Sequence, residues 1–296
     1  MKLKKSFCVI IIFVMIISSS AFSLADSDIS NRLSDLKTWM MQNDYLFPQE
    51  MDTAIAGIDA AGEGKKLVVI DDHMNEVLSV NLNDLIGSDY EFDGLAGCIE
   101  DTAGGWFVLF SLNELSDEPM TGLYHLAPNG SCLWSSVFSQ QVEWGWTLLA
   151  ADGTGGAYLV HTRTDHYKEA LIRHFSPEGK ITWKKTLSFD GLVFSPFAGR
   201  SAGSNMTLYG TAVSNSNGIF RTVLIEFNTQ GKIVATEARD FGKISSDYAT
   251  KIIWNRENQL PYLIYVTTSQ QTTPLSELPL CAFPSLNLTD ADDSVH

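Results

Sequence analysis

The sequence predicts an all-β protein, a β-propeller of about five four-stranded meander blades, behind a signal peptide and one short amphipathic helix. Three observations lead to this prediction. A two-turn pattern recurs at intervals of 42 to 54 residues, the runs between the turns look like strands, and the N-terminus looks like an export signal. The expected divisions are a signal peptide (1–25), an N-terminal helical segment (26–50), the propeller (51–290) and an acidic tail (291–296).

The N-terminus predicts secretion. Three lysines within the first five residues precede an apolar run over residues 7–17, and a small-residue cleavage site ends at Ala25. An apolar run of this length is too short to cross roughly 30 Å of hydrocarbon at about 1.5 Å per residue. We therefore expect a bacterial-type export signal cut after Ala25, no transmembrane segment in the mature chain, and a secreted or extracellular protein.

The segment that follows the signal predicts one helix. Ile29, Leu33, Leu36 and Met40 follow helical spacing, which gives the segment an apolar side. Packing of this side on the propeller is the simplest explanation for it. Pro48 is expected to mark the end of the helical segment, because proline interrupts a helix.

Composition limits the partners. The formal charge of the chain is −15, and removing the three signal lysines lowers it to −18. Nucleic acid and anionic membranes both need a basic surface, so neither is an expected partner. The mature part keeps Cys98, Cys132 and Cys281, an odd number without a C-x-x-C pair, so the sequence predicts no disulfide framework and no zinc site.

Each repeat contains two tight turns. The residues that begin the first turn are Asp59, Asp101, Asp152, Ser201 and Asn255, and the second turn ends in Gly130, Gly179 or Gly231 in the clearest copies. Short glycine turns between apolar runs of strand length make antiparallel hairpins, so each repeat is a four-stranded meander. A single meander cannot bury both of its faces, and radial stacking of such sheets gives a propeller. A β-sandwich uses similar hairpins and is the alternative.

Two copies carry a tryptophan four residues after the second turn glycine, in GKITW (179–183) and GSCLW (130–134). We expect Trp183 and Trp134 to wedge between neighbouring blades from the outermost strand. The pattern resembles the tryptophan-docking motif of quinoprotein-type (PQQ-like) propeller repeats, over most of residues 55–290. Some members of that family hold PQQ and a calcium ion and act as dehydrogenases. The chain lacks their vicinal cysteine pair and about half the length of an eight-bladed enzyme, so no cofactor is expected.

Catalytic and metal sites have simpler structural explanations in this sequence. Glycoside hydrolysis needs two facing carboxylates, but the turn aspartates recur at one phase of the repeat, where aspartate stabilises the turn itself. His161, Asp165 and His166 could suggest a metal site, but strand residues five apart point to opposite faces. The sequence therefore predicts no catalytic and no metal-binding residues. An extracellular enzyme that acts on glycans through axial carboxylates is the alternative function.

Ligand binding is predicted on one rim of the propeller. The loops between second and third strands and the linkers between blades vary freely, and meander geometry places both sets on the same rim. The linkers share an acid beside an aromatic residue, in DYEFDG (89–94), VEWGW (142–146), FDG (189–191) and SDY (246–248).

These linkers predict an acidic, aromatic-lined funnel near the axis. Aromatic faces with nearby carboxylates suit a carbohydrate or a cationic peptide or protein partner, through stacking, hydrogen bonds and cation–π attraction. The predicted ligand-binding residues are Tyr90, Phe92, Asp93, Glu143, Trp144, Trp146, Phe189, Asp190, Asp247 and Tyr248. The alternative explanation is that the rings pack between blades and that the Asp-Gly pairs form turns.

Overall fold

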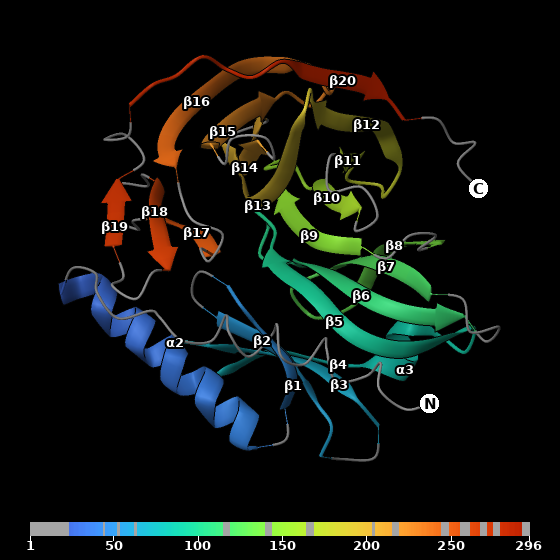
Figure 1. Cartoon of the computed structure of the whole chain (residues 1–296). Coiled ribbons are helices and arrows are strands. Elements are labelled where there is room, and N and C mark those ends of the chain that lie inside the picture. The colour runs from blue at the N-terminus through green and yellow to red at the C-terminus, as the bar shows by residue number, and fades with distance from the viewer. Residues whose placement is uncertain are drawn as a thin grey trace, which may run out of the picture.

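The fold consists of one long helix followed by five antiparallel sheets in chain order (Figure 1). The computed structural model describes residues 24–43, 45–51, 54–61, 64–114, 119–139, 144–163, 169–202, 205–214, 219–243, 249–254, 261–266, 271–274 and 279–291. The helices in these ranges are α2 (Leu24–Gln42) and the short α3 (Leu82–Ile86). Neither of them has the length together with the apolar character that a membrane crossing requires.

Within each of the first four sheets, strands that are consecutive along the chain pair with each other. The first sheet consists of β1 (Tyr45–Glu50), β2 (Ala54–Asp59), β3 (Lys66–Asp71) and β4 (Glu76–Asn81), and the second of β5 (Tyr90–Glu100), β6 (Trp106–Glu114), β7 (Pro119–Leu126) and β8 (Cys132–Ser139). The third consists of β9 (Trp144–Ala151), β10 (Ala157–Arg163), β11 (Glu169–Phe175) and β12 (Ile181–Phe189), and the fourth of β13 (Leu192–Ala202), β14 (Asn205–Ser214), β15 (Ile219–Phe227) and β16 (Ile233–Lys243). The fifth consists of β17 (Ala249–Trp254), β18 (Pro261–Val266) and β19 (Gln271–Pro274).

The N-terminal segment is a helix in its first part and a strand in its second. Helix α2 buries Leu33, Leu36 and Met40, three residues of the predicted apolar stripe. The chain then forms β1, and Pro48 lies inside this strand, where the register with β2 shifts between Leu46 and Gln49. Proline is tolerated at such an irregularity because it cannot donate a ladder hydrogen bond. The first sheet therefore obtains its fourth strand from the segment that the sequence assigned to the helix.

The first sheet shows how alternation creates two apolar faces. Ile55, Val68 and Ile70 point toward the buried side of α2. Their neighbours Ala56 and Val69 point the other way, into the core that the first sheet shares with the second. This division follows from the two-residue period of strand side chains, and it places α2 on the face of the first sheet that is turned away from the second.

Successive sheets meet along their first strands. Strand β1 contacts β5, β5 contacts β9, β9 contacts β13, and β13 contacts β17. Figure 1 shows β5, β9 and β13 turned toward a common centre, with β12 and β16 farther out. Apolar side chains fill the seams, such as Phe107 and Leu159 between the second and third sheets, and Leu187 and Leu208 between the third and fourth. The predicted four-stranded meander is confirmed in the first four sheets, the fifth sheet has three described strands, and the arrangement is propeller-like.

A bulge recurs in the fourth strand of the first four sheets. In the third sheet His174 pairs with Trp183 and Phe175 pairs with Ile181, so Thr182 is the extra residue. The extra residues of the other three sheets are Val77, Leu133 and Val234. These three apolar side chains are between 41% and 58% exposed, because the bulge turns them away from the core.

The C-terminal segment returns to the third and fourth sheets. Residues 279–281 bond to β16, and β20 (Leu286–Asp290) then joins the outer edge of β12 as a fifth, antiparallel strand. Figure 1 shows this red segment crossing over β16 toward β12. The repeat pattern did not predict this return. Of the predicted acidic tail, residues 292–296 lie outside the described residues.

Candidate functional site

The two ends of the strands form two different rims. At one end, the tight turns 101–105, 127–131, 152–156, 176–180 and 228–232 connect paired strand ends, and we call this end the turn rim. At the other end, the register pairs Tyr90 with Glu114, Met120 with Ser139, and Glu169 with Ser188, and we call this end the loop rim. The connections between second and third strands and the linkers between sheets therefore share the loop rim, as the sequence predicted.

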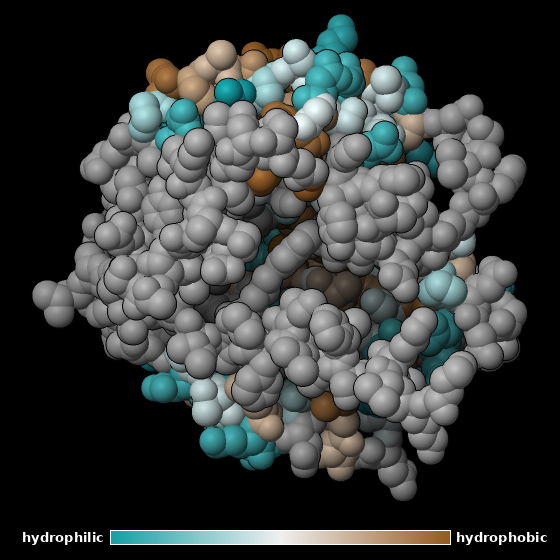
Figure 2. Space-filling view, viewed as in Figure 1, coloured by the Kyte–Doolittle hydropathy of each residue, from teal (hydrophilic) through white to brown (hydrophobic). Residues whose placement is uncertain are grey.

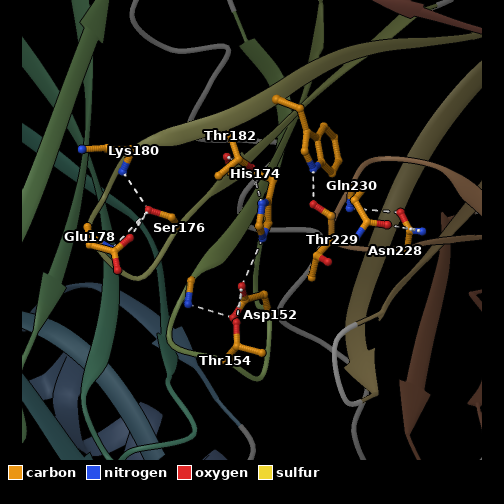
Figure 3. Close-up of polar contacts among 12 residues, drawn as sticks. Asp152, Thr154, His174, Ser176, Glu178, Lys180, Thr182, Asn228, Thr229 and Gln230 are labelled. Carbon is orange, nitrogen blue, oxygen red and sulfur yellow. Dashed lines mark hydrogen bonds and ion pairs between the residues drawn. The ribbon is translucent and has the colours of Figure 1, made fainter.

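The second and third sheets each contain a buried Asp–His pair at the turn rim, Asp101 with His125 and Asp152 with His174, and Figure 3 shows the pair of the third sheet. Asp152 Oδ1 accepts from the backbone N–H groups of Thr154 and Gly156, at 2.7 and 2.8 Å. Its Oδ2 lies 2.9 Å from the Thr154 hydroxyl and 3.1 Å from His174 Nε2. Asp101 likewise accepts from the backbone N–H groups of Ala103 and Gly105 and contacts His125 Nε2, but Ala103 has no hydroxyl to match that of Thr154.

Both aspartates belong to the structure of the turns. Burial alone would raise the pKa of Asp152, but the hydrogen bonds from His174, Thr154 and Gly156 lower it to about 2. The pKa of Asp101 is lowered in the same way, by His125, Gly105 and Ala103 against burial. Asp152 is only 1% exposed, and its oxygens are occupied within the fold. The structural explanation for these two turn aspartates is therefore confirmed.

The Asp152–His174 pair is expected to make stability depend on acid pH. The folded pKa of Asp152, about 2, lies below its ordinary value of 3.8, so the contribution of this carboxylate is complete above pH 3.8 and is lost as the pH falls toward 2. The free energy of unfolding, measured with urea at several pH values in this range, should decrease as the pH is lowered. Asp152→Asn, whose amide does not titrate, should be less stable at neutral pH and show a shallower fall. An equal slope in both proteins would contradict this assignment.

The two tryptophans join each sheet to the turn of the next. Trp134 lies against Gly179, where an added Cβ would come within 2.6 Å of its ring. Trp183 lies against Gly231 in the same way, and its Nε1 donates to Thr229 O at 2.8 Å. The first sheet uses smaller side chains, since Leu78 and Val80 contact Gly130 (a Cβ there would lie 3.2 and 2.6 Å away). The predicted wedge between neighbouring sheets is confirmed, with a turn glycine as its receptor.

The two Asp–His units differ at the second histidine nitrogen. His174 Nδ1 lies 2.5 Å from Thr182 Oγ1 (Figure 3). In the second sheet the corresponding bulge residue is Leu133, which has no hydroxyl, and His125 Nδ1 is buried without a hydrogen-bond partner among the described residues. Sequence reasoning missed both histidines as aspartate partners. The signal was present, because each stands five residues before the turn glycine, at His125 and His174.

Leu133→Thr is expected to stabilise the protein by about 0.5 to 1.5 kcal/mol, the usual net value of one hydrogen bond. The new hydroxyl would reach His125 Nδ1 as Thr182 reaches His174. Leu133→Val is the matched control, because it is β-branched but has no hydroxyl. Chemical denaturation of the three proteins measures the difference. Equal stability of the threonine and valine variants would contradict the proposed bond.

The predicted site residues of the second sheet lie at the start of β5 on the loop rim. Asp93 is exposed, whereas Tyr90 and Phe92 are partly buried against the core of the first and second sheets. The ring of Phe92 meets Phe110 edge-on at 5.7 Å, and Lys65 Nζ lies 5.0 Å from its centroid. Phe92 therefore packs in the seam, Tyr90 is partly buried beside it, and Asp93 is exposed.

The other predicted residues do not all join them. Phe189 ends the outer strand β12, is 3% exposed and packs against Phe194 and Phe283. Asp190 accepts a 2.7 Å hydrogen bond from Asn287 of the C-terminal segment. The two residues therefore lie at the outer edge instead of near the axis, because an outermost strand carries them.

Three predicted residues and two side chains lie outside what the structure describes. Trp144 begins β9, and Trp146 follows in the same strand, so their backbone belongs to the loop-rim half of the third sheet. Glu143, Asp247 and Tyr248 lie outside the described residues. Figure 2 shows the face seen in Figure 1, which is hollowed near its centre, with apolar residues visible in the hollow.

A buried arginine and a buried histidine lie in the seam between the second and third sheets. Arg173, 9% exposed, lies over the ring of Phe138 at 4.7 Å. His161 is 1% exposed, its Nδ1 lies 3.4 Å from Thr147 Oγ1, and burial together with Arg173 holds its pKa well below the usual range. Within the described ranges, no three His, Cys, Asp or Glu side chains gather where they could hold a metal ion. The two candidate partners of His161 in the metal hypothesis, at 165 and 166, lie outside those ranges.

Comparisons with known proteins give similarities of structure only. No protein-family model and no curated protein matches the chain. Among solved structures, it is similar to a europium-containing methanol dehydrogenase, with a TM-score of 0.34 and 10% identity over 74% of this chain and 51% of that one. It is also similar to the WD40 domain of coronin from Toxoplasma gondii, with a TM-score of 0.33 and 9% identity over 84% and 73%. The chain spans about half the length of the methanol dehydrogenase it matches.

Proposed function

We propose that the chain is a secreted binding module that recognises a carbohydrate or a cationic peptide on its loop rim and catalyses nothing. The observation that carries this proposal is the division between the two rims. The buried carboxylates of the turn rim, Asp101 and Asp152, hydrogen-bond to the backbone of their turns and to His125 and His174. The loop rim instead carries the connections whose length and composition vary from sheet to sheet, which is typical of a binding face on a rigid scaffold.

The acids at the loop-rim ends of β5 and β6 favour a cationic peptide over a neutral ligand. Glu91, Asp93 and Glu114 are exposed there, on the ends of β5 and β6. The whole chain has a formal charge of −15, so its field attracts positive ligands. The half-buried Tyr90 beside these carboxylates supplies an aromatic surface for stacking or cation–π contact.

The proposal includes export and a closed ring. The lysine-flanked apolar run before residue 18 supports an export signal, and cleavage after Ala25 would leave nearly all of α2 in the mature protein. The contact of β13 with β17 supports placing the fifth sheet after the fourth in the ring. Helix α2 then lies between the fifth sheet and the first, because it covers the face of the first sheet that no second-sheet residue occupies.

Arrays of glycans and of cationic peptides, probed with the mature protein, test the proposed function. Asp93→Asn is expected to weaken the binding of an array ligand several-fold without lowering the melting temperature. Glu100→Gln is the matched control, because Glu100 is exposed on the same strand β5 but at the turn rim. The absence of any array ligand, or equal losses in both variants, would contradict binding at the loop rim.

A further inference from the structure

The C-terminal segment 279–291, which we call the strap, holds together two sheets that precede it in the chain. On the fourth sheet, Asp240 N donates to Pro279 O, and Cys281 N donates to Ala238 O, both at 3.0 Å. On the third sheet, β20 pairs with β12 from Lys185 opposite Asp290 to Phe189 opposite Leu286. The strap therefore bonds mainly through its backbone, to the edges of two neighbouring sheets.

Partly buried apolar and exposed polar side chains alternate along β20, as in a strand that covers an apolar edge. Leu286 and Leu288 are partly buried against the core of the third and fourth sheets, whereas Asn287 and Thr289 are exposed. Phe283 packs on Phe189 with ring centroids 5.9 Å apart. Without the strap, Phe189 and the edge of β12 would face solvent, and an exposed apolar edge strand is a template for pairing with another chain.

Two side-chain contacts fix the register of the strap. Asn287 Nδ2 donates to Asp190 Oδ1 at 2.7 Å, and Lys185 Nζ donates to Asp290 Oδ1 at 2.5 Å. One partner of each contact, Lys185 or Asp190, belongs to β12 or follows it directly, and the other partner, Asp290 or Asn287, belongs to the strap. None of these contacts depends on the strap and β12 being in the same molecule.

We propose that the outer edge of β12 is a strand-addition site that a second copy of this chain fills with its own strap, which gives a strap-exchanged dimer. The segment that fits this edge is the strap itself, and a second copy supplies it with the same leucines, amide and acid. Exchange of a terminal element preserves every contact, so it is a low-cost route to a two-fold dimer.

The tether sets the conditions for exchange. A short linker gives the chain's own strap an effective concentration on the order of millimolar, so the intramolecular contact dominates in dilute solution. Exchange should appear when the intramolecular contact is weakened or when the protein is concentrated. Two complementary charge variants of the Lys185–Asp290 pair, when mixed, weaken the intramolecular contact but leave the exchanged contact between the two variants intact.

Two full-length variants, Lys185→Asp and Asp290→Lys, test the proposal when mixed. Each alone places like charges together in its own strap contact, whereas an exchanged heterodimer restores opposite charges at both contacts. After mild urea treatment and its removal, under reducing conditions that keep Cys132 from forming disulfides, light scattering should show several-fold more dimer in the mixture than in either variant alone. The double variant Lys185→Asp/Asp290→Lys, which restores the pair within one chain, is the matched control and should stay a monomer.

A synthetic peptide of residues 279–291 completes the test. Added in excess, it should displace the exchanged strap from the edge of β12 and return the mixed dimer to monomer. No more dimer in the mixture than in the double variant, with all proteins folded by circular dichroism, would overturn the proposal. A dimer that the peptide does not dissociate would also overturn it, because another surface would then hold it. If one variant fails to fold, concentrated wild-type protein gives the same two readouts with the peptide.

Discussion

Trp183→Ala is expected to lower the free energy of unfolding by about 3 kcal/mol, the low end of the range for removing a large packed aromatic side chain, because the ring is partly buried. The ring stacks on His174 at 5.6 Å, lies 6.4 Å from Phe227 of the next sheet and covers Gly231. Its removal empties the junction between the third and fourth sheets and leaves Thr229 O without its donor. Urea unfolding, followed by tryptophan-independent circular dichroism, measures the loss.

Trp183→Phe separates the two parts of this effect. Phenylalanine keeps most of the packing but cannot donate to Thr229 O. Trp183→Phe should therefore cost the roughly 1 kcal/mol of one hydrogen bond plus a small amount for the packing that the smaller ring loses. A loss below about 1 kcal/mol for Trp183→Ala, well under the range for a buried aromatic ring, would mean that the ring does not hold the sheets together.

Gly179→Ala is expected to cost more than either its backbone strain or its added volume would cost alone. Gly179 has φ +77°, where an alanine side chain costs about 1 to 2 kcal/mol. The added Cβ would also lie 2.6 to 2.8 Å from three ring atoms of Trp134, and such overpacking typically costs about 1 to 3 kcal/mol more. Thermal and urea unfolding of the variant measure the sum.

Gly191→Ala and a double variant are the controls for this result. Gly191 has a similar φ of +67°, but nothing lies within 4 Å of an added Cβ, so its substitution reports backbone strain alone. In Trp134→Ala/Gly179→Ala the clash is absent, so the two losses should add to more than the double variant shows. Equal costs at Gly179 and Gly191 would contradict the docking of Trp134 on this turn.

The turn half of the second and third sheets could be predicted because its signals are local, whereas the prediction for Asp59 was wrong, since Asp59 ends β2 and begins the connection to β3 and not the first turn of its sheet. Asp152, Gly179 and Trp183 stand at short, repeated distances along the chain, and all three lie at the turn-rim end of the third sheet, where Gly179 receives Trp134 and Trp183 covers Gly231. The role of His174 was missed although it stands at a repeated position, because a buried histidine partner needs the register of two strands to be known. Local spacing thus predicted the turns but not the hydrogen bonds from the turn aspartates to the histidines of the third strands.

The predicted funnel depended on information that the sequence does not carry locally. The sequence predicts Phe92 and Phe189 near the axis because each adjoins an acid in a linker. Lys65 and Phe110 cover Phe92, and Phe283 covers Phe189, and both contacts arise from segments distant in the chain. The strap illustrates the same limit, since β20 pairs with residues about a hundred positions upstream.

The arrangement of the sheets around one axis is the claim on which the loop rim, the strap and the tryptophan docking all depend. A crystal structure of the mature protein tests it most directly. We predict five sheets around a common centre, with β17–β19 beside α2 and Trp183 Nε1 bonded to Thr229 O. Sheets packed in two stacked layers, or a fifth sheet that lies away from α2 and the first sheet, would contradict this architecture and the binding face proposed on it.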